Sequence, residues 1–478
     1  MKSRRDGQNQ YIMKKSVLIV FASFFFLSQQ VRAQFTIDAE LRPRGEVYHG
    51  YKALAAKKQE TGFSISQRTR LNFGYGSKFI DLYVSLQDVR IWGSAPQLTM
   101  GTSPAPWLHQ AFAVGKLAKW ADIKVGRQEI IIEDHRIFGN VGWAQQARAH
   151  DAALLRFRPD EKTKLWIAGA YNQSGANLVG TLYTTPRNYK TMQFLWMKRN
   201  FGKFHASILF LNNGLQVNAS DSIAFLGTDT LTTFIKYAEK NTYFSQTAGL
   251  RAGYGGEKFK AVAQFFYQFG HNGKFTIDST GTSTSGEFGI NRTKLNAMLA
   301  RLDLLGKLGP ITLTAGYEYQ SGNSQVNPNA NDEAFNPFFG TNHKFNGLMD
   351  YFYVGNHIGS VGLHDPFFGV KYTHKGFFIG ATAHYFLAGG QVNDPNNLGT
   401  AMSSGLGAEL DIVTGYKFNE EVSLLAGYSN MFGTSTMVAL KGGDRTVLSN
   451  WGFLMVTYKP KLFNSDNFMK KLAEKKEG

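Results

Sequence analysis

The chain has 478 residues, no cysteine, a formal charge of +17 and 14% aromatic side chains, with 39 phenylalanines and 21 tyrosines. The absence of cysteine excludes disulfides, thiolate catalysis, cysteine-based metal sites and a lipid anchor on an N-terminal cysteine. A basic balance fits a nucleic acid, an anionic membrane or an anionic solute as partner. We expect no nucleic acid, because the chain has no basic helix and no known nucleic-acid-binding motif.

The first predicted element is a secretory signal peptide over residues 1–33. Two lysines precede a short apolar run at 16–27, and a small-residue cleavage site ends at Ala33. The run is too short for a membrane anchor, and no later stretch reaches the ~18 apolar residues of a spanning helix. Met1 and Met13 both stay open as the start of the chain.

From residue 34 to residue 460 the chain repeats one unit, which is a strand, a tight turn and a second strand. Near the middle, Phe265, Tyr267 and Phe269 alternate with the more polar set of Gln264 and Gln268. A period of two is typical of a strand with one apolar and one polar face. About 18 strands are predicted, each roughly the ~9–11 residues that cross a bilayer, at 35–48, 63–75, 79–91, 108–118, 121–131, 148–157, 163–172, 190–199, 203–212, 244–254, 258–269, 293–304, 310–320, 366–374, 377–387, 405–416, 421–430 and 449–459.

The connections alternate between short turns, such as 76–78, and long loops, such as 213–243 and 321–365. Bacterial outer-membrane barrels have short turns on the periplasmic side and long loops outside the cell. The sequence therefore predicts an all-β fold, a single transmembrane antiparallel β-barrel of the outer-membrane porin type. We expect a monomer in outer-membrane lipid, with both termini periplasmic and a charged periplasmic tail over 461–478.

The positions of the charges predict which face lines the lumen, because an Arg or Lys that faces lipid at mid-membrane costs roughly 2–4 kcal/mol. Cations in a water-filled pore attract anions. The strand residues assigned to a pore lining by this reasoning are Arg42, Arg44, Arg68, Arg70, Arg156, Arg251, Lys260 and Lys371. A second interpretation stays open, in which these charges pair across the lumen and only hold the strands together.

An ordered set of motifs resembles the alginate-export family of outer-membrane β-barrels. The set comprises QDVR at 87–90, VGRQEI at 125–130, DHRIFG at 134–139, Trp143, RAHDA at 148–152 and FNGLMD at 345–350. The resemblance covers most of the chain. It implies a monomeric barrel with an arginine-lined lumen that passes an anionic uronate polysaccharide. It adds Arg127, Arg136, Arg148 and Asp151 to the expected pore positions.

The loop 321–365 is predicted to fold into the barrel mouth and to narrow the pore. Its second part carries many aromatic side chains, which would not be left in water. In that position Lys344, Asp350 and His343 would touch the solute. The other arrangement left open is a lid over the rim, formed with neighbouring loops.

We expect a passive outer-membrane channel for an alginate-like polyuronate or its fragments, with periplasmic partners if it exports. Two alternatives remain, an uptake porin for small anionic nutrients and an outer-membrane hydrolase. The sequence contains no G-x-S-x-G motif, so we do not expect an enzyme. Its histidines lack the spacing of a zinc site, so we expect no metal and no other cofactor.

Overall fold

The computed structural model describes residues 33–98, 106–183, 185, 188–216, 219–225, 233–239, 242–278 and 289–466. Nearly all of the predicted signal peptide and the end of the predicted tail lie outside these residues.

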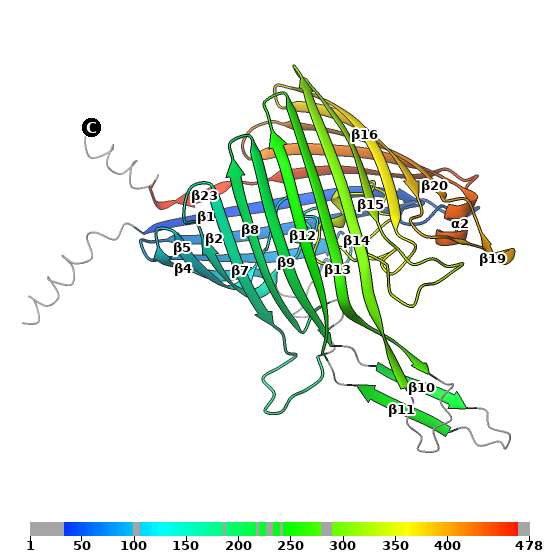
Figure 1. Ribbon diagram of the computed structural model, residues 1–478. Coiled ribbons are helices and arrows are strands. Elements are labelled where there is room, and N and C mark those ends of the chain that lie inside the picture. Colours follow the sequence, from blue (N-terminus) through cyan, green and yellow to red (C-terminus); the bar gives the residue numbers. More distant parts are fainter. Residues whose placement is uncertain are drawn as a thin grey trace, which may run out of the picture.

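The described chain forms a closed antiparallel β-barrel of 18 strands (Figure 1). β1 (Gln34–His49) pairs with β2 on one side and with β22 and β23 on the other, which closes the barrel. β22 and β23 lie end to end and form the last strand. The other wall strands are β2 (Gly62–Gly76), β3 (Ile80–Ile91), β4 (Trp107–Ala118), β5 (Ala121–Gln128), β6 (His150–Phe157), β7 (Thr163–Tyr171), β8 (Thr191–Phe201), β9 (Phe204–Gln216), β12 (Thr242–Gly255), β13 (Phe259–Asp278), β14 (Gly289–Leu308), β15 (Ile311–Gln320), β16 (Leu363–His374), β17 (Phe377–Leu387), β20 (Gly405–Lys417), β21 (Val422–Gly433), β22 (Ser449–Tyr458) and β23 (Lys461–Asn464).

The predicted fold class is confirmed, and every predicted strand corresponds to an observed one. The wall continues through β23 to Asn464, so it extends past residue 460 into the predicted tail. β13 and β14 are each 20 residues long and run well beyond the predicted ends at 269 and 293. Bilayer thickness sets only the minimum length, because paired strands satisfy each other's backbone hydrogen bonds outside the membrane as well.

Three connections predicted as loops contain secondary structure. The stretch 213–243 contains the hairpin of β10 (Ala219–Phe225) and β11 (Thr233–Glu239), which forms a sheet separate from the barrel. The next, 388–404, contains β18 (Asn393–Asp394) and β19 (Asn397–Ala401), and 431–448 contains α2 (Ser435–Lys441). In the described part of the chain, no helix is long and apolar enough to span a membrane.

The outer face of the wall is covered by exposed large apolar side chains. Leu82, Ile208, Leu250, Phe265 and Leu454 are examples from five strands around the ring. Such a belt would promote aggregation in water, whereas it is the surface that an outer-membrane barrel presents to lipid.

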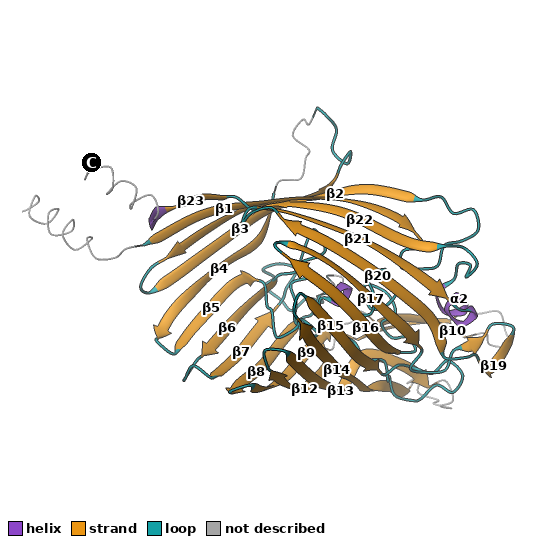
Figure 2. Cartoon of the chain, turned by 90° about the horizontal axis from the view of Figure 1, so that it is seen from above, coloured by secondary structure: helices purple, strands orange, loops and turns teal. Residues whose placement is uncertain are grey.

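Two loops leave the wall and fold into the barrel, where Figure 2 shows them inside the ring of strands. The first inner loop, residues 129–149, connects β5 to β6. The second, residues 321–362, connects β15 to β16 and includes the 3-10 turn η2 (Asn342–Lys344). The loops bind each other through their backbones, with Gly139 N donating to Phe339 O (2.8 Å) and Thr341 N to His135 O (2.9 Å). We call the two loops together the plug.

Candidate functional site

The inner face of β1 and β2 is charged, as predicted, and it holds the first inner loop. Arg42, Arg44 and Arg68 are each less than 8% exposed. Arg42 donates to the carbonyl groups of Gly142 (2.8 Å) and Trp143 (3.0 Å). Arg44 donates to the Trp143 carbonyl (2.7 Å) and lies 4.1 Å over its ring. These arginines therefore bind protein groups, and among them Arg44 also lines the cavity on the long-loop side described below.

Several other predicted lumen cations are paired with carboxylates. Arg68 pairs with Glu40 across the β1–β2 hairpin. The remaining pairs are Arg44 with Glu46 (2.8 Å), Arg70 with Glu129 (3.7 Å), Arg156 with Asp122 (2.6 Å) and Arg251 with Glu133 (3.1 Å). For these residues the structure favours the second interpretation, in which charges inside the barrel hold parts of the protein together.

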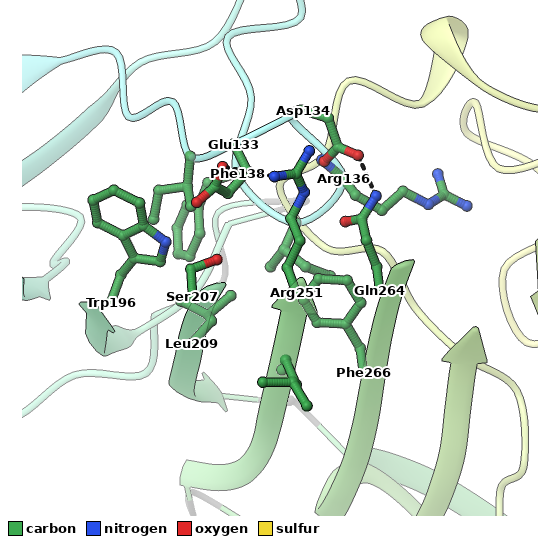
Figure 3. A pocket seen from close by; sticks show the side chains of 14 residues that line it. Glu133, Asp134, Arg136, Phe138, Trp196, Ser207, Leu209, Arg251, Gln264 and Phe266 are labelled. Carbon is green, nitrogen blue, oxygen red and sulfur yellow. Dashed lines mark hydrogen bonds and ion pairs between the residues drawn. The ribbon is translucent and has the colours of Figure 1, made fainter. Parts of the chain in front are cut away.

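The tip of the first inner loop contacts β12 and β13 around a small cavity of about 20 Å³ (Figure 3). Arg251 on β12 reaches Glu133, and Gln264 on β13 donates to Asp134. Glu133 has a positive φ of 50°, so the loop turns sharply where it meets the wall. This contact fixes the end of the loop on the far side of the barrel from β1.

Arg136 is the most deeply buried charge of the plug. Its guanidinium lies 2.5 Å from Glu318 on β15, and Arg301 on β14 binds the other oxygen of that carboxylate at 3.0 Å. The Arg136 side chain is fully buried, and burial lowers the pKa of its guanidinium while Glu318 opposes this change. A family motif residue thus serves as an anchor between the first inner loop and the wall.

Arg127 and Asp151 lie on the outer face of the wall, and the prediction that they line the pore is not what the structure shows. Their side chains are 42% and 60% exposed, and they pair with each other at 2.8 Å. They alternate with Gln128 and His150, which are buried on the inner face. Successive strand residues point to opposite faces, so this pair faces outward near the long-loop end.

The second inner loop folds into the lumen and is anchored on inner-wall carboxylates. Leu348 N donates to Asp411 (3.3 Å), and Met349 N donates to Glu409 (2.8 Å). The Asn346 amide donates to Glu318 (2.9 Å) and to Asp365 (3.1 Å). The inward arrangement expected from the aromatic content is therefore the one that the structure adopts.

Two of the residues expected to touch a solute, His343 and Asp350, line the cavity on the long-loop side described below and also bind other protein groups. His343 Nδ1 lies 2.6 Å from Asp350 Oδ1, and Tyr51 donates to the other oxygen of Asp350. The His343 ring stacks on Trp143, with 4.6 Å between ring centres. His343 and Asp350 therefore join the two inner loops to the end of β1.

Two cavities lie on opposite sides of the loop segment 340–355. One, of about 410 Å³, opens beside Tyr48 and Ser64, where β1 and β2 meet a long loop. The other, of about 390 Å³, is lined by Phe378, Gly380 and Thr382 of β17, close to the short turn between β16 and β17. The first cavity is lined by residues 340, 342, 343, 350 and 353–355 and the second by residues 344–348, so this segment separates them.

Each cavity has two cations with no carboxylate partner among the residues that the structure describes. Lys52 and Arg148 line the cavity on the long-loop side. Burial lowers the pKa of Arg148 to about 10, so it stays charged at neutral pH. Lys344 and Lys371 line the cavity on the short-turn side, where Lys371 lies 4.1 Å over the ring of Phe378. Lys260 lies further toward the short turns, on the inner face of β13.

The main feature that the sequence analysis missed is an apolar inner wall. Met192, Phe194, Leu211 and Leu299 point inward and are at most 3% exposed. They pack against plug residues such as Phe138, whose ring lies 4.7 Å from that of Phe194. Inward side chains of this barrel are therefore not always polar, because they are apolar where an inner loop packs against the wall.

Two polar residues of the site also escaped the sequence analysis. Arg301 carries the inward parity of β14, and His384 carries that of β17, where it binds Asp365 at 2.9 Å. A strict parity count along LARLDL at 299–304 would have found Arg301. Among the described residues, no group of three or more His, Asp or Glu side chains is arranged to hold a metal ion.

A scan against protein-family models finds no match, and a search of curated proteins finds none either. The alginate-export resemblance therefore depends on its short motifs alone. Among solved structures, the chain is similar to Pseudomonas aeruginosa OpdL, with 13% identity, a TM-score of 0.55 and coverage of 90% of this chain and 99% of that one. It is also similar to P. aeruginosa OccK3 (OpdO), with 13% identity, a TM-score of 0.53 and coverage of 90% and 96%. For the outer membrane protein opdK of P. aeruginosa the values are 9%, 0.51, 89% and 98%. At these identities the likeness concerns the fold.

Proposed function

We propose that this protein is a passive outer-membrane channel for the uptake of small anionic solutes, such as carboxylated nutrients. The observation that carries the proposal is the placement of four cations that have no carboxylate partner among the described residues, Lys52 and Arg148 on one side of segment 340–355 and Lys344 and Lys371 on the other. Fixed positive charge in a confined aqueous space concentrates anions. An anion that passes the segment would leave one cationic cavity and enter the next.

The plug favours a small solute over a polysaccharide. Phe138 and Phe335 are fully buried where the inner loops pack on the wall, and the loops share backbone hydrogen bonds. Cavities of about 410 and 390 Å³ are within the range that holds a small ligand. A polymer chain would have to displace much of this packed core, so we place uptake of small anions before polyuronate export.

The fold likeness to an outer membrane protein supports the same location for this chain. In this proposal the protein is a monomer in outer-membrane lipid, and it has no enzymatic activity. Both ends of the described chain lie at the short-turn end of the barrel (Figure 1), which would be the periplasmic side.

The proposal is tested by reversing charges in the short-turn cavity. Lys344→Glu combined with Lys371→Glu should shift the reversal potential in a salt gradient toward cation selectivity and weaken block by small carboxylates. The effect should grow at low salt, because screening falls. Lys203→Glu, a single reversal of the same kind at an exposed short turn, is the control and should leave selectivity unchanged. An unchanged reversal potential in the folded double variant would contradict the proposal.

A further inference from the structure

Four carboxyl groups of the inner wall face the second inner loop. Glu318 lies on β15, Asp365 on β16, and Glu409 and Asp411 on β20. All four are at most 4% exposed, and among them Asp411 lines the short-turn cavity. A buried carboxylate is costly unless a cation or hydrogen bonds compensate for it.

The compensation is unequal among them. Glu318 binds Arg136 and Arg301, and Asp365 binds His384 at 2.9 Å. Asp411 accepts a hydrogen bond from Ser429 (2.5 Å) and lies 3.8 Å from His384 Nε2. Glu409 has no cation within ion-pair distance among the described residues, and its Oε2 has no hydrogen-bond partner.

Glu409 and Asp411 lie two residues apart on one strand, so both point to the same face. Two buried carboxyl groups on the same face of one strand do not both ionise readily, because each negative charge disfavours the other. The charged and titratable groups that face them are His384 on β17, Asp365 on β16, and Asp350 and Tyr351 on the second inner loop. Asp411 also lines the short-turn cavity, together with Arg301, Lys344 and Lys371, whereas Glu409 is not among the residues that line it.

The narrowing segment rests directly on this pair. Leu348 N and Met349 N donate to Asp411 and Glu409. Gly347 has a φ of +81°, and a Cβ there would lie 2.6 Å from the Glu409 carboxyl group. The backbone of residues 347–349 is therefore in close contact with both carboxyl groups, and any change in their charge acts on it first.

We propose that Glu409 holds a proton and, together with Asp411, forms a latch that keeps segment 346–350 in the lumen. The proposal assumes the channel function above. When the proton leaves for bulk water at alkaline pH, two adjacent negative charges remain and require hydration. Asp411 lines the short-turn cavity, but water can reach Glu409 only if residues 347–349 move away, so the constriction widens.

The latch is tested on the full-length protein in planar bilayers, with single-channel conductance in KCl measured from about pH 5 to about pH 10. The native channel should show one rise in conductance on the alkaline side, of roughly twofold or more. Glu409→Gln mimics the protonated acid and should keep the low conductance throughout. Asp122→Asn removes a buried inner-wall carboxyl group that pairs with Arg156 and should retain the rise.

A conductance that is independent of pH in the native protein, or an equal rise in native protein and Glu409→Gln, would overturn the latch and leave the channel function intact. No conductance at any pH would instead refute the channel function. Gly347→Ala adds a second test that does not alter the wall. Its methyl group should push the segment off Glu409 and give high conductance at every pH, and native-like conductance at neutral pH would contradict the latch.

Discussion

The barrel has two kinds of inner wall, and they hold the plug in different ways. On β6, β8, β9 and β14 a group of inward side chains is apolar and packs against the plug as in a soluble core. On β1, β2, β15 and β20 they are charged and bind the plug through loop carbonyls, amides and Arg136. Both walls follow the same alternation of inward and outward side chains. The place of a residue in that alternation gives the direction of its side chain but not the groups that the side chain contacts.

The difference teaches where solute is expected. The apolar wall excludes water and holds the plug in place. On the polar wall, charged side chains that the plug does not cover remain available to a solute. Lys371 is such a residue, and it lines a cavity. Substitutions and deletions that weaken the apolar wall or the polar wall should therefore differ in their effects.

Removal of the second inner loop should have the largest effect. Replacing residues 337–359 by a glycine-serine bridge removes the segment that separates the two cavities. Single-channel conductance should rise roughly severalfold, and block by small carboxylates should weaken. Removal of the hairpin 219–239, whose described strands pair only with each other, is the control. Unchanged conductance of an inserted barrel would place the loop outside the permeation path.

Arg136→Ala should loosen the polar anchor. It leaves Glu318 buried with one guanidinium partner fewer, which typically costs about 3–5 kcal/mol. The loss should appear as faster hydrogen exchange of residues 129–149, with the barrel strands unaffected. Arg127→Ala removes an exposed pair on the outer face, so its effect should stay within about 1 kcal/mol. Equal effects of the two variants would contradict the anchor role.

Acid should loosen the second inner loop through His357. Burial lowers the pKa of this histidine to about 3, and Nε2 lies 2.9 Å from the Gly362 carbonyl oxygen. The released loop binds a proton near the usual pKa of about 6.5. Docking is therefore fully stable above that pH and weakens as the pH falls toward 3.

Hydrogen exchange or limited proteolysis of the second inner loop over this pH range checks the prediction. His357→Gln has no such proton to bind and should show a flatter profile. A native protein whose loop is equally protected at pH values on both sides of about 6.5 would argue against it.

Ile130→Val probes the apolar wall with the smallest change. Ile130 is 1% exposed in the plug core, and removal of one buried methylene group there should cost about 0.5–1.5 kcal/mol. The same change at Ile208, which faces outward on β9, should cost less, because the position is half exposed. Hydrogen exchange of the first inner loop separates the two variants.

Much of the wall could be predicted from the sequence because strand alternation and turn length depend on residues that are close together in the chain. The alternation in TIDAELRPR at 36–44 determines which side of β1 faces inward, and the positions of Arg42 and Arg44 confirm it. Short turns and long loops determine the order in which strands pair. The aromatic content of the second inner loop indicated that it is buried.

The contacts inside the barrel depend on pairs of residues far apart in the chain. The sequence does not reveal that Arg136 meets Glu318, that the carbonyl of Trp143 binds Arg44, or that Lys371 forms no ion pair with any carboxylate in the described part of the chain. Arg127 was assigned to the lumen by its motif, although its parity with the outward Val125 pointed to lipid. Alternation along a strand is set by the backbone of that strand alone, so the inward and outward faces of the wall follow from the sequence. The partner of each inward charge depends on how two distant loops fill a common volume, and only the tertiary structure decided that.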